Sequence, residues 1–170
     1  MSPAAPLLEV RDLVKHFPLQ RHPFAVLRRR APARVVHAVD GVSFEVAAGE
    51  TLGLVGESGC GKTTTGRLVL RAIEPTHGRV LFEGEDITSL PSGRLLPFRR
   101  KAQIVFQDPY SSLNPRMTVG AMVAEPIRVH GIAAGAEVEA RVRSFLDMVG
   151  LSAEYGRRYP HGLSGRQRQP

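Results

Sequence analysis

The order of apolar and polar positions along the 170-residue chain predicts strands that alternate with helices. Short runs of apolar or alternating residues predict strands at 7–10, 42–46, 51–55, 79–82 and 102–106. Helical spacing of apolar residues predicts helices over 62–73, 91–100, 119–129 and 137–149. Loops rich in glycine or proline separate them, above all at 56–61 and 111–117. This alternation is typical of an α/β domain.

The overall composition is that of a folded protein. Hydrophobic residues make up 42% of the chain, and 23 basic against 16 acidic residues give a formal net charge of +7. This balance argues against intrinsic disorder. No run approaches the ~18 apolar residues of a membrane span, and residues 1–10 show no signal-peptide pattern. With Cys60 as its one cysteine, the chain has no intrachain disulfide and no multi-cysteine metal site.

The positive charge is concentrated in one stretch. No acidic residue occurs between Asp12 and Asp40, where six basic residues lie: Lys15, Arg21, Arg28, Arg29, Arg30 and Arg34. One interpretation is a patch that binds phosphate, nucleic acid or anionic lipid. The other is a solvated surface loop, which the prolines of this stretch favour. The histidines at 16, 22, 37, 77 and 130 show no metal-ligand spacing, and we assign them no role.

A glycine-rich loop between the strand at 51–55 and the helix at 62–73 matches the pattern G-x-x-x-x-G-K-[ST]. Glycines let the backbone wrap closely around phosphate oxygens, and the N–H groups then point inward at the start of a helix. Lys62 would reach the β- and γ-phosphates, and Thr63 would place its hydroxyl on Mg²⁺. We therefore expect ATP and Mg²⁺ as cofactors. The alternative is a glycine-rich turn that binds nothing, with Cys60 a filler at a variable position. The expected binding residues are Gly56, Glu57, Ser58, Gly59, Cys60, Gly61, Lys62, Thr63 and Thr64.

Two later motifs, Val105-Phe106-Gln107-Asp108-Pro109 and Leu163-Ser164-Gly165-Arg166-Gln167, extend the phosphate-loop pattern. Together the three resemble the ATP-binding subunit of an ABC transporter. The resemblance implies an α/β P-loop NTPase fold of the ABC ATPase type, with an antiparallel β subdomain, a RecA-like core and a helical subdomain. It places the nucleotide-binding core at 7–110, with a basic insertion at 18–35. The helical subdomain would occupy 111–165 and end in the signature motif.

The resemblance also implies roles for single residues. Gln107 resembles the Q-loop glutamine, a catalytic residue that touches Mg²⁺ or its water; alone, a glutamine after a strand is commonplace. Phe17 lies where the family has an aromatic ring that stacks on adenine, although on sequence grounds alone such a residue is more often a loop anchor. Ser164 and Gly165 would contact the γ-phosphate bound to the other subunit of a head-to-tail dimer.

The finer resemblance is to oligopeptide and dipeptide importer subunits, of which the nickel importers are close relatives. It rests on residues 106–119 and on Tyr159-Pro160-His161. It implies a second ABC ATPase subunit, identical or different, and transmembrane permease subunits as partners. The protein would then lie peripherally on the cytoplasmic face of the membrane, and nucleic acid is not an expected partner.

Two departures from the family pattern qualify this expectation. Arg166 stands where the signature L-S-G-G-Q has its second glycine. Its side chain would hinder the close approach of the backbone to the γ-phosphate; the alternative is that its charge binds the phosphate. Family members continue into an apolar strand that ends in Asp-Glu, which these 170 residues do not contain. We therefore expect a C-terminally incomplete fold with low solubility, weak nucleotide binding and little or no hydrolysis.

Three functions remain open from the sequence. The first is the ATP-binding subunit of a peptide importer. The second is a soluble ABC-type ATPase that acts on ribosomes or DNA, which the basic stretch mildly favours. The third is a fragment that does not hydrolyse ATP.

Overall fold

The computed structural model describes residues 5–19, 34–108 and 113–163. They belong to two compact units, Met1–Gln103 and Ile104–Pro170, and each unit has its own cluster of buried apolar side chains. Within the described ranges, no helix is both long enough and apolar enough to cross a lipid bilayer.

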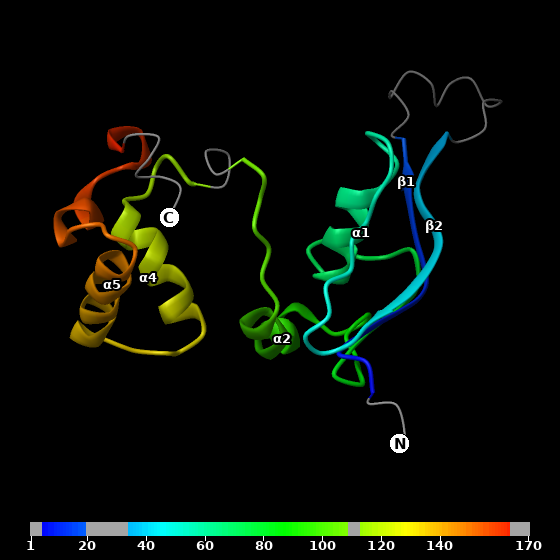
Figure 1. The fold of residues 1–170 in the computed structure, drawn as a ribbon, viewed down its shortest axis with the longest axis horizontal. Helices are drawn as coiled ribbons and strands as arrows, with labels where there is room; N and C mark the ends of the chain where they lie inside the picture. The colour runs from blue at the N-terminus through cyan, green and yellow to red at the C-terminus, as the bar shows by residue number, and fades with distance from the viewer. Residues whose placement is uncertain (1–4, 20–33, 109–112, 164–170) are drawn as a thin grey trace, which may run out of the picture. The chain divides into compact units, whose positions relative to one another are not determined.

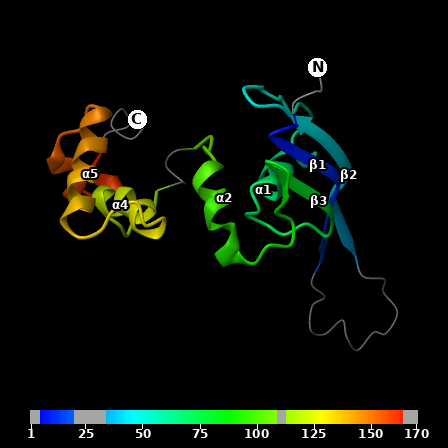
Figure 2. The ribbon, with the colours of Figure 1, turned by 90° about the horizontal axis from the view of Figure 1, so that it is seen from below.

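The first unit is built on an antiparallel sheet with the strand order β2-β1-β3-β4. The strands are β1 (Leu8–Pro18), β2 (Val35–Val46), β3 (His77–Phe82) and β4 (Glu85–Asp86). The two long strands form a curved hairpin, and β3 runs along the other edge of β1 (Figures 1 and 2). The antiparallel β part of the expected fold is thereby confirmed.

Both hairpin strands are longer than the sequence predicts. The prediction that a loop follows directly after Val10 is wrong, because β1 continues to Pro18 and β2 already begins at Val35. The Leu19 amide donates a hydrogen bond to the Arg34 carbonyl at 2.9 Å, so the pairing reaches one residue beyond each strand. Basic and histidine side chains are tolerated there because one face of these strands is open to solvent. The remainder of the basic insertion, residues 20–33, lies outside the described residues.

The β1–β2 ladder changes register three times. Between the pairs Lys15↔Val39 and His16↔His37, β1 advances by one residue and β2 by two, which leaves Ala38 as an extra residue on β2. Such a bulge bends its strand and changes the direction in which nearby side chains point. The bulge at Ala38 therefore sets which side chains of β2 share a face.

Helix α1 (Lys62–Val69) lies against this sheet and buries Leu68 in its core (Figure 2). It ends earlier than predicted because Arg71, with φ 51°, leaves the helical region. The expected helix at 91–100 is confirmed as η2 (Ser92–Leu95) followed by α2 (Leu96–Lys101). The buried apolar residues of this core are Val10, Leu13, Val39, Leu68, Val80, Ile87, Leu95 and Phe98.

The strands predicted at 51–55 and 102–106 are not found. Neither segment has strand hydrogen bonding in the structure, and the residues Val55 and Val105 are 97% and 95% exposed. A strand forms only where a second strand accepts its backbone hydrogen bonds, and no parallel pair occurs among residues 5–19, 34–108 and 113–163. An apolar run predicts that a segment is suited to burial, but it does not supply the partner.

The second unit is helical. The predicted helices at 119–129 and 137–149 are confirmed as α4 (Val119–Val129) and α5 (Ala136–Met148). Two short 3₁₀ helices follow, η3 (Ala153–Arg157) and η4 (Pro160–Gly162). Gly120 in α4 approaches η3 so closely that a Cβ on it would lie 2.8 Å from the Gly156 carbonyl oxygen. The buried core is Val119, Ala124, Ile127, Val138, Val142, Leu146, Leu151 and Leu163.

We predict that Gly78→Ala destabilises the first unit far more than Gly84→Ala. Both glycines have positive φ, 88° and 80°, so both changes cost roughly 1–2 kcal/mol of backbone strain. Only at Gly78 does the new Cβ meet backbone, 2.3 Å from the Asp12 carbonyl oxygen. The added crowding raises the expected cost there to roughly 2–5 kcal/mol. Urea denaturation followed by circular dichroism measures both variants, and equal losses of stability would contradict the close approach.

Candidate functional site

The glycine-rich loop runs directly into α1. Gly61 caps the helix with φ 97° and ψ 0°, and Gly59 also has a positive φ, 84°. A residue with a side chain rarely adopts these conformations, so the glycines of the motif fit what the loop backbone requires. All residues from Gly56 to Cys60 are exposed. The loop is therefore a solvent-accessible turn at the N-terminus of an eight-residue helix.

Gly61 lies against strand β2. A Cβ at this position would be 2.2 Å from the Ala38 carbonyl oxygen and 3.6 Å from a methyl carbon of Val39. The helix start is thus held at the strand bulge by a contact that only glycine permits. The sequence analysis missed Ala38 as a support of the loop. No sequence signal marks it, because it acts through its backbone carbonyl.

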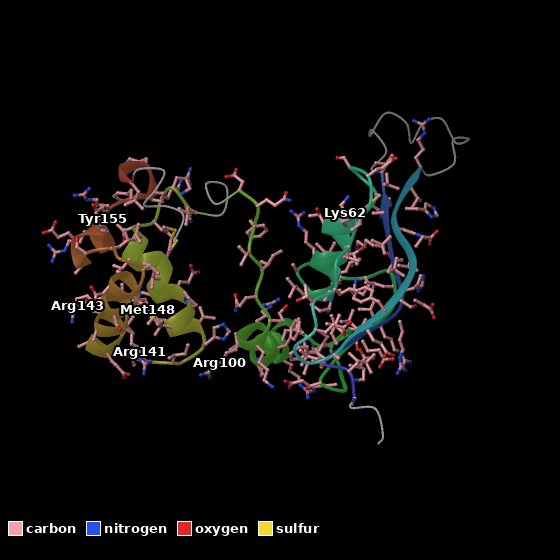
Figure 3. The ribbon with its side chains drawn as sticks, viewed as in Figure 1. Lys62, Arg100, Arg141, Arg143, Met148 and Tyr155 are labelled. Atoms are coloured by element: carbon pink, nitrogen blue, oxygen red, sulfur yellow. The ribbon has the colours of Figure 1, made fainter. Side chains whose placement is uncertain are left out.

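The Lys62 side chain folds over the loop (Figure 3). Its ammonium donates to the carbonyl oxygens of Gly56 at 2.7 Å and Glu57 at 2.6 Å, and it lies 3.5 Å from the Cys60 sulfur. The positive charge is therefore placed at the loop itself. Gly56 is constrained on the same side, because a Cβ there would lie 2.7 Å from that sulfur.

Three consecutive threonines in the first turns of α1 have different environments. The Thr65 hydroxyl donates to the Gly61 carbonyl at 3.0 Å and the residue is buried. Thr63 is exposed and Thr64 is half-buried. Thr65 therefore stabilises the helix start, a role the sequence analysis did not assign although threonine often bonds to the carbonyl four residues earlier. The predicted ligand Thr63 is the one whose side chain faces solvent.

Phe17 lies near the end of β1, opposite Val36, with 38% of its surface exposed. The Lys15 ammonium is 4.9 Å from the centre of its ring and donates to the Glu74 carbonyl at 2.7 Å. The residue is therefore part of the β1–β2 ladder. Its exposure leaves ring surface open to a flat ligand, and adenine stacking stays a prediction.

The other predicted site residues lie in the second unit or outside the described residues. Gln107 is an exposed residue in a bend of the second unit. Ser164 and Gly165, together with Arg166, fall beyond the described range that ends at residue 163. The roles of all these residues stay predictions.

The loop has the chemistry of an anion site. Backbone N–H groups at a helix N-terminus carry a partial positive charge, and a lysine ammonium adds a full one. The glycine positions keep side chains out of the space around the backbone, as the contacts expected of a Cβ at Gly56 and Gly61 show. An exposed hydroxyl at Thr63 is of the oxygen type that Mg²⁺ prefers. These residues fit a phosphate group together with its metal ion.

Comparison with known proteins agrees with this description. The chain is 50% identical over 164 residues to the glutathione import ATP-binding protein GsiA of Salmonella paratyphi A. It is 51% identical over the same length to GsiA of Escherichia coli strain K12. Each alignment covers 96% of this chain and 26% of the relative. The chain thus spans about a quarter of the length of these curated relatives.

Solved structures show the same fold. The dimeric structure of a post-hydrolysis state of the ATP-binding cassette MJ0796, bound to ADP and Pi, matches with a TM-score of 0.72 and 25% identity. The match covers 95% of this chain and 65% of the other. It confirms the expected P-loop ABC ATPase fold, present here in part. The family profile described as ABC transporter matches residues 39–170, and the chain therefore belongs to the ABC transporter family.

Proposed function

We propose that this chain is the nucleotide-binding part of the ATP-binding subunit of an ABC importer for small peptides. The observation that carries the proposal is the start of α1, where Gly61 contacts the backbone of β2 and Lys62 lies over the phosphate loop. This geometry supports binding of ATP with Mg²⁺ at residues 56–64. Similarity over nearly the whole chain to proteins named for glutathione import supports the importer and the peptide-like substrate.

Each residue of the loop then has a specific task. The amides of the loop hold phosphate oxygens, and the Lys62 ammonium exchanges its two loop carbonyls for oxygens of the β- and γ-phosphates. Thr63 offers its hydroxyl to Mg²⁺, and Phe17 stacks on the base. Gln107 is the residue that the family resemblance assigns to the metal ion or its water. Mg²⁺, if held by the Thr63 hydroxyl, would help to neutralise the negative charge of the phosphates.

The proposal extends to partners and location. Ser164 and Gly165 would contact the γ-phosphate bound to a second ABC ATPase subunit, as the family resemblance implies. The solved relative is itself described as a dimeric ATP-binding cassette, which supports such pairing. Transmembrane permease subunits would hold the dimer at the cytoplasmic face of the membrane, and they would determine which peptide is carried.

We predict that Lys62→Ala lowers ATP affinity about 10- to 100-fold, because a hydrogen bond to a charged group contributes roughly 1.5–3 kcal/mol. Isothermal titration of the full chain with Mg·ATP measures the change. Lys101→Ala is the matched control, since Lys101 pairs with Glu83 on the surface of the same unit. Equal affinity in the Lys62 and Lys101 variants would remove the phosphate site from the proposal.

We predict that Phe17→Ala lowers affinity for ATP but not for inorganic tripolyphosphate, which has no base to stack. Loss of one base–aromatic contact costs roughly 1–3 kcal/mol. Phe17→Tyr keeps a flat ring and is expected to restore ATP binding. The Lys62→Ala variant, in contrast, should weaken both ligands. An equal loss of ATP and tripolyphosphate affinity on Phe17→Ala would assign Phe17 to the fold and not to the base.

We predict that the protein sediments with membranes only in cells that contain its cognate permease subunits. Antibody detection in membrane and ribosome fractions, from cells with and without the permease genes, makes the comparison. Attachment to membranes through the permease is the physical basis of the expected result. Cosedimentation with ribosomes in both strains would favour the soluble ABC-type ATPase instead.

A further inference from the structure

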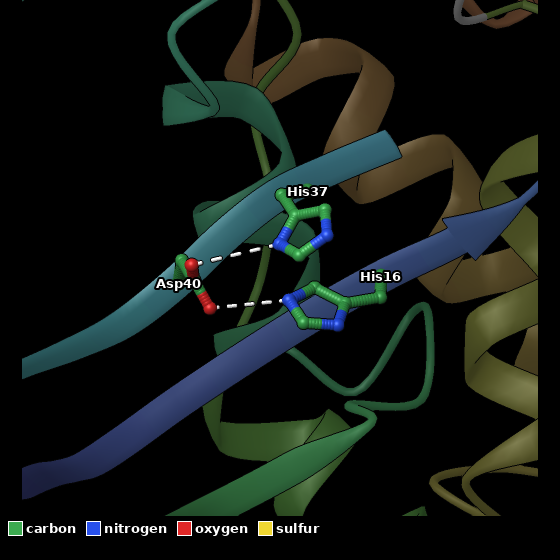
Figure 4. Close-up of side chains that lie close together, drawn as sticks. All are labelled: His16, His37 and Asp40. Atoms are coloured by element: carbon green, nitrogen blue, oxygen red, sulfur yellow. Dashed lines mark hydrogen bonds and ion pairs between the residues drawn. The ribbon is translucent and has the colours of Figure 1, made fainter. Parts of the chain in front are cut away.

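Two histidines and an aspartate meet on the β1–β2 hairpin, outside the phosphate site (Figure 4). His16 comes from β1, and His37 and Asp40 come from β2. One nitrogen from each imidazole and one carboxylate oxygen all lie within 4.8 Å of one another. The two rings are 3.9 Å apart at their centres and tilted by 41°. All three side chains therefore converge on one small volume.

The strand bulge produces this convergence. His16 and His37 are directly opposite each other across the ladder, which is the closest relation two strands offer. In a regular strand, residues three apart such as His37 and Asp40 point to opposite faces. The extra residue Ala38 changes the alternation between them, so both point to the same side. Neither relation is visible as a spacing in the sequence.

The distances suit one metal ion. The His16 Nε2 atom is 3.1 Å from one Asp40 oxygen, and the His37 Nδ1 atom is 3.6 Å from the other. Two ligand atoms that are each about 2.0–2.1 Å from a tetrahedral zinc ion lie about 3.3 Å apart. Both observed separations are within a few tenths of an ångström of that edge. The three donor atoms lie within 4.8 Å of one another, and rotation of their side chains would bring them onto one centre.

The donor set selects the type of metal. Two imidazole nitrogens with one carboxylate oxygen suit Zn²⁺, whereas Mg²⁺ and Ca²⁺ prefer oxygen ligands alone. Asp40 and His37 are 66% and 56% exposed at their side chains, so a water molecule can complete four-coordination. We propose that His16, His37 and Asp40 form a surface Zn²⁺ site that links β1 to β2.

The surrounding charges are compatible with a cation. The Lys15 ammonium next in sequence is held elsewhere, by the Glu74 carbonyl and over the Phe17 ring. No other lysine or arginine is paired with Asp40 among the ion pairs of the described residues.

A metal at this place would act on the nucleotide site through the backbone. Ala38 lies between His37 and Asp40, and its carbonyl is the atom against which Gly61 packs. A bound ion fixes both strands on either side of this bulge. The inference does not depend on ATP binding or on the proposed transport function.

The test is titration of the metal-free full chain with ZnCl₂ by calorimetry. We expect one zinc ion to bind per chain. The variants His37→Ala and Asp40→Asn should each weaken zinc binding roughly 10-fold or more, because removal of even an outer-shell partner of a metal ion weakens binding by that much. His77→Ala, in the same sheet but outside the cluster, and Cys60→Ser, which removes the one thiol, should keep the wild-type affinity. MgCl₂ should give no binding at the His16, His37 and Asp40 cluster. It is tested with the Thr63→Ala variant, because Thr63 is the residue proposed to bind Mg²⁺ at the phosphate loop.

Two further readouts decide between a metal site and a simple ion pair. Zn²⁺ should raise the melting temperature of the wild-type chain and of His77→Ala but not of Asp40→Asn, because a ligand that binds only the folded state stabilises it. Co²⁺ used in place of Zn²⁺ should give the visible absorption of a tetrahedral ion in the wild-type chain and in His77→Ala, but not in Asp40→Asn. Zinc affinity unchanged in both His37→Ala and Asp40→Asn, or lost with Cys60→Ser alone, would overturn the proposal.

Discussion

The described part of the phosphate site depends on one backbone contact, the packing of Gly61 against the Ala38 carbonyl. It fixes the start of α1 at the bulge of β2, and Leu68 then enters the core beside Val39 and Val80. The loop before the helix must turn back with Gly59 and Gly61 in left-handed conformations. Glycine adopts these conformations without strain, and the contact with β2 sets where the turn into α1 is made. The sheet therefore determines the geometry of the loop, although it contributes no side chain to it.

Local signals predicted the helices well and the strands less well. Helices α4 and α5 follow from apolar residues at helical spacing, a pattern that lies within one segment. Strands need partners that are distant in sequence, so their extent was misjudged in both directions. Backbone pairing extends β1 through residues 11–18 and β2 through residues 35–41. The polar side chains in these ranges interrupt the apolar pattern from which a strand is predicted. Apolar residues predict strands at 51–55 and 102–106, but no described segment pairs with either of them.

The same distinction separates the predicted part of the site from the rest. Gly59, Gly61 and Lys62 were predicted because conformational freedom and charge are properties of single residues at fixed offsets. Ala38 was not, since its contribution is a carbonyl that every residue has. His16 and His37 show no metal-ligand spacing in the sequence, so no role is predicted for them. In the structure they lie opposite each other in the β1–β2 ladder. Only register, with a bulge that shifts side-chain direction, shows that they meet Asp40.

The buried apolar side chains of the described residues form two hydrophobic cores that share no residue, one around Leu68 and one around Val142. Cooperative folding depends on packing that couples all parts of a structure, so a chain with two cores need not behave as a two-state system. A single midpoint measured on the whole chain would then average two opening equilibria. Hydrogen exchange resolved by residue would instead assign each amide to its own unit. Ligands of the first unit would slow exchange there, and the amides of α4 and α5 would report separately on the second unit.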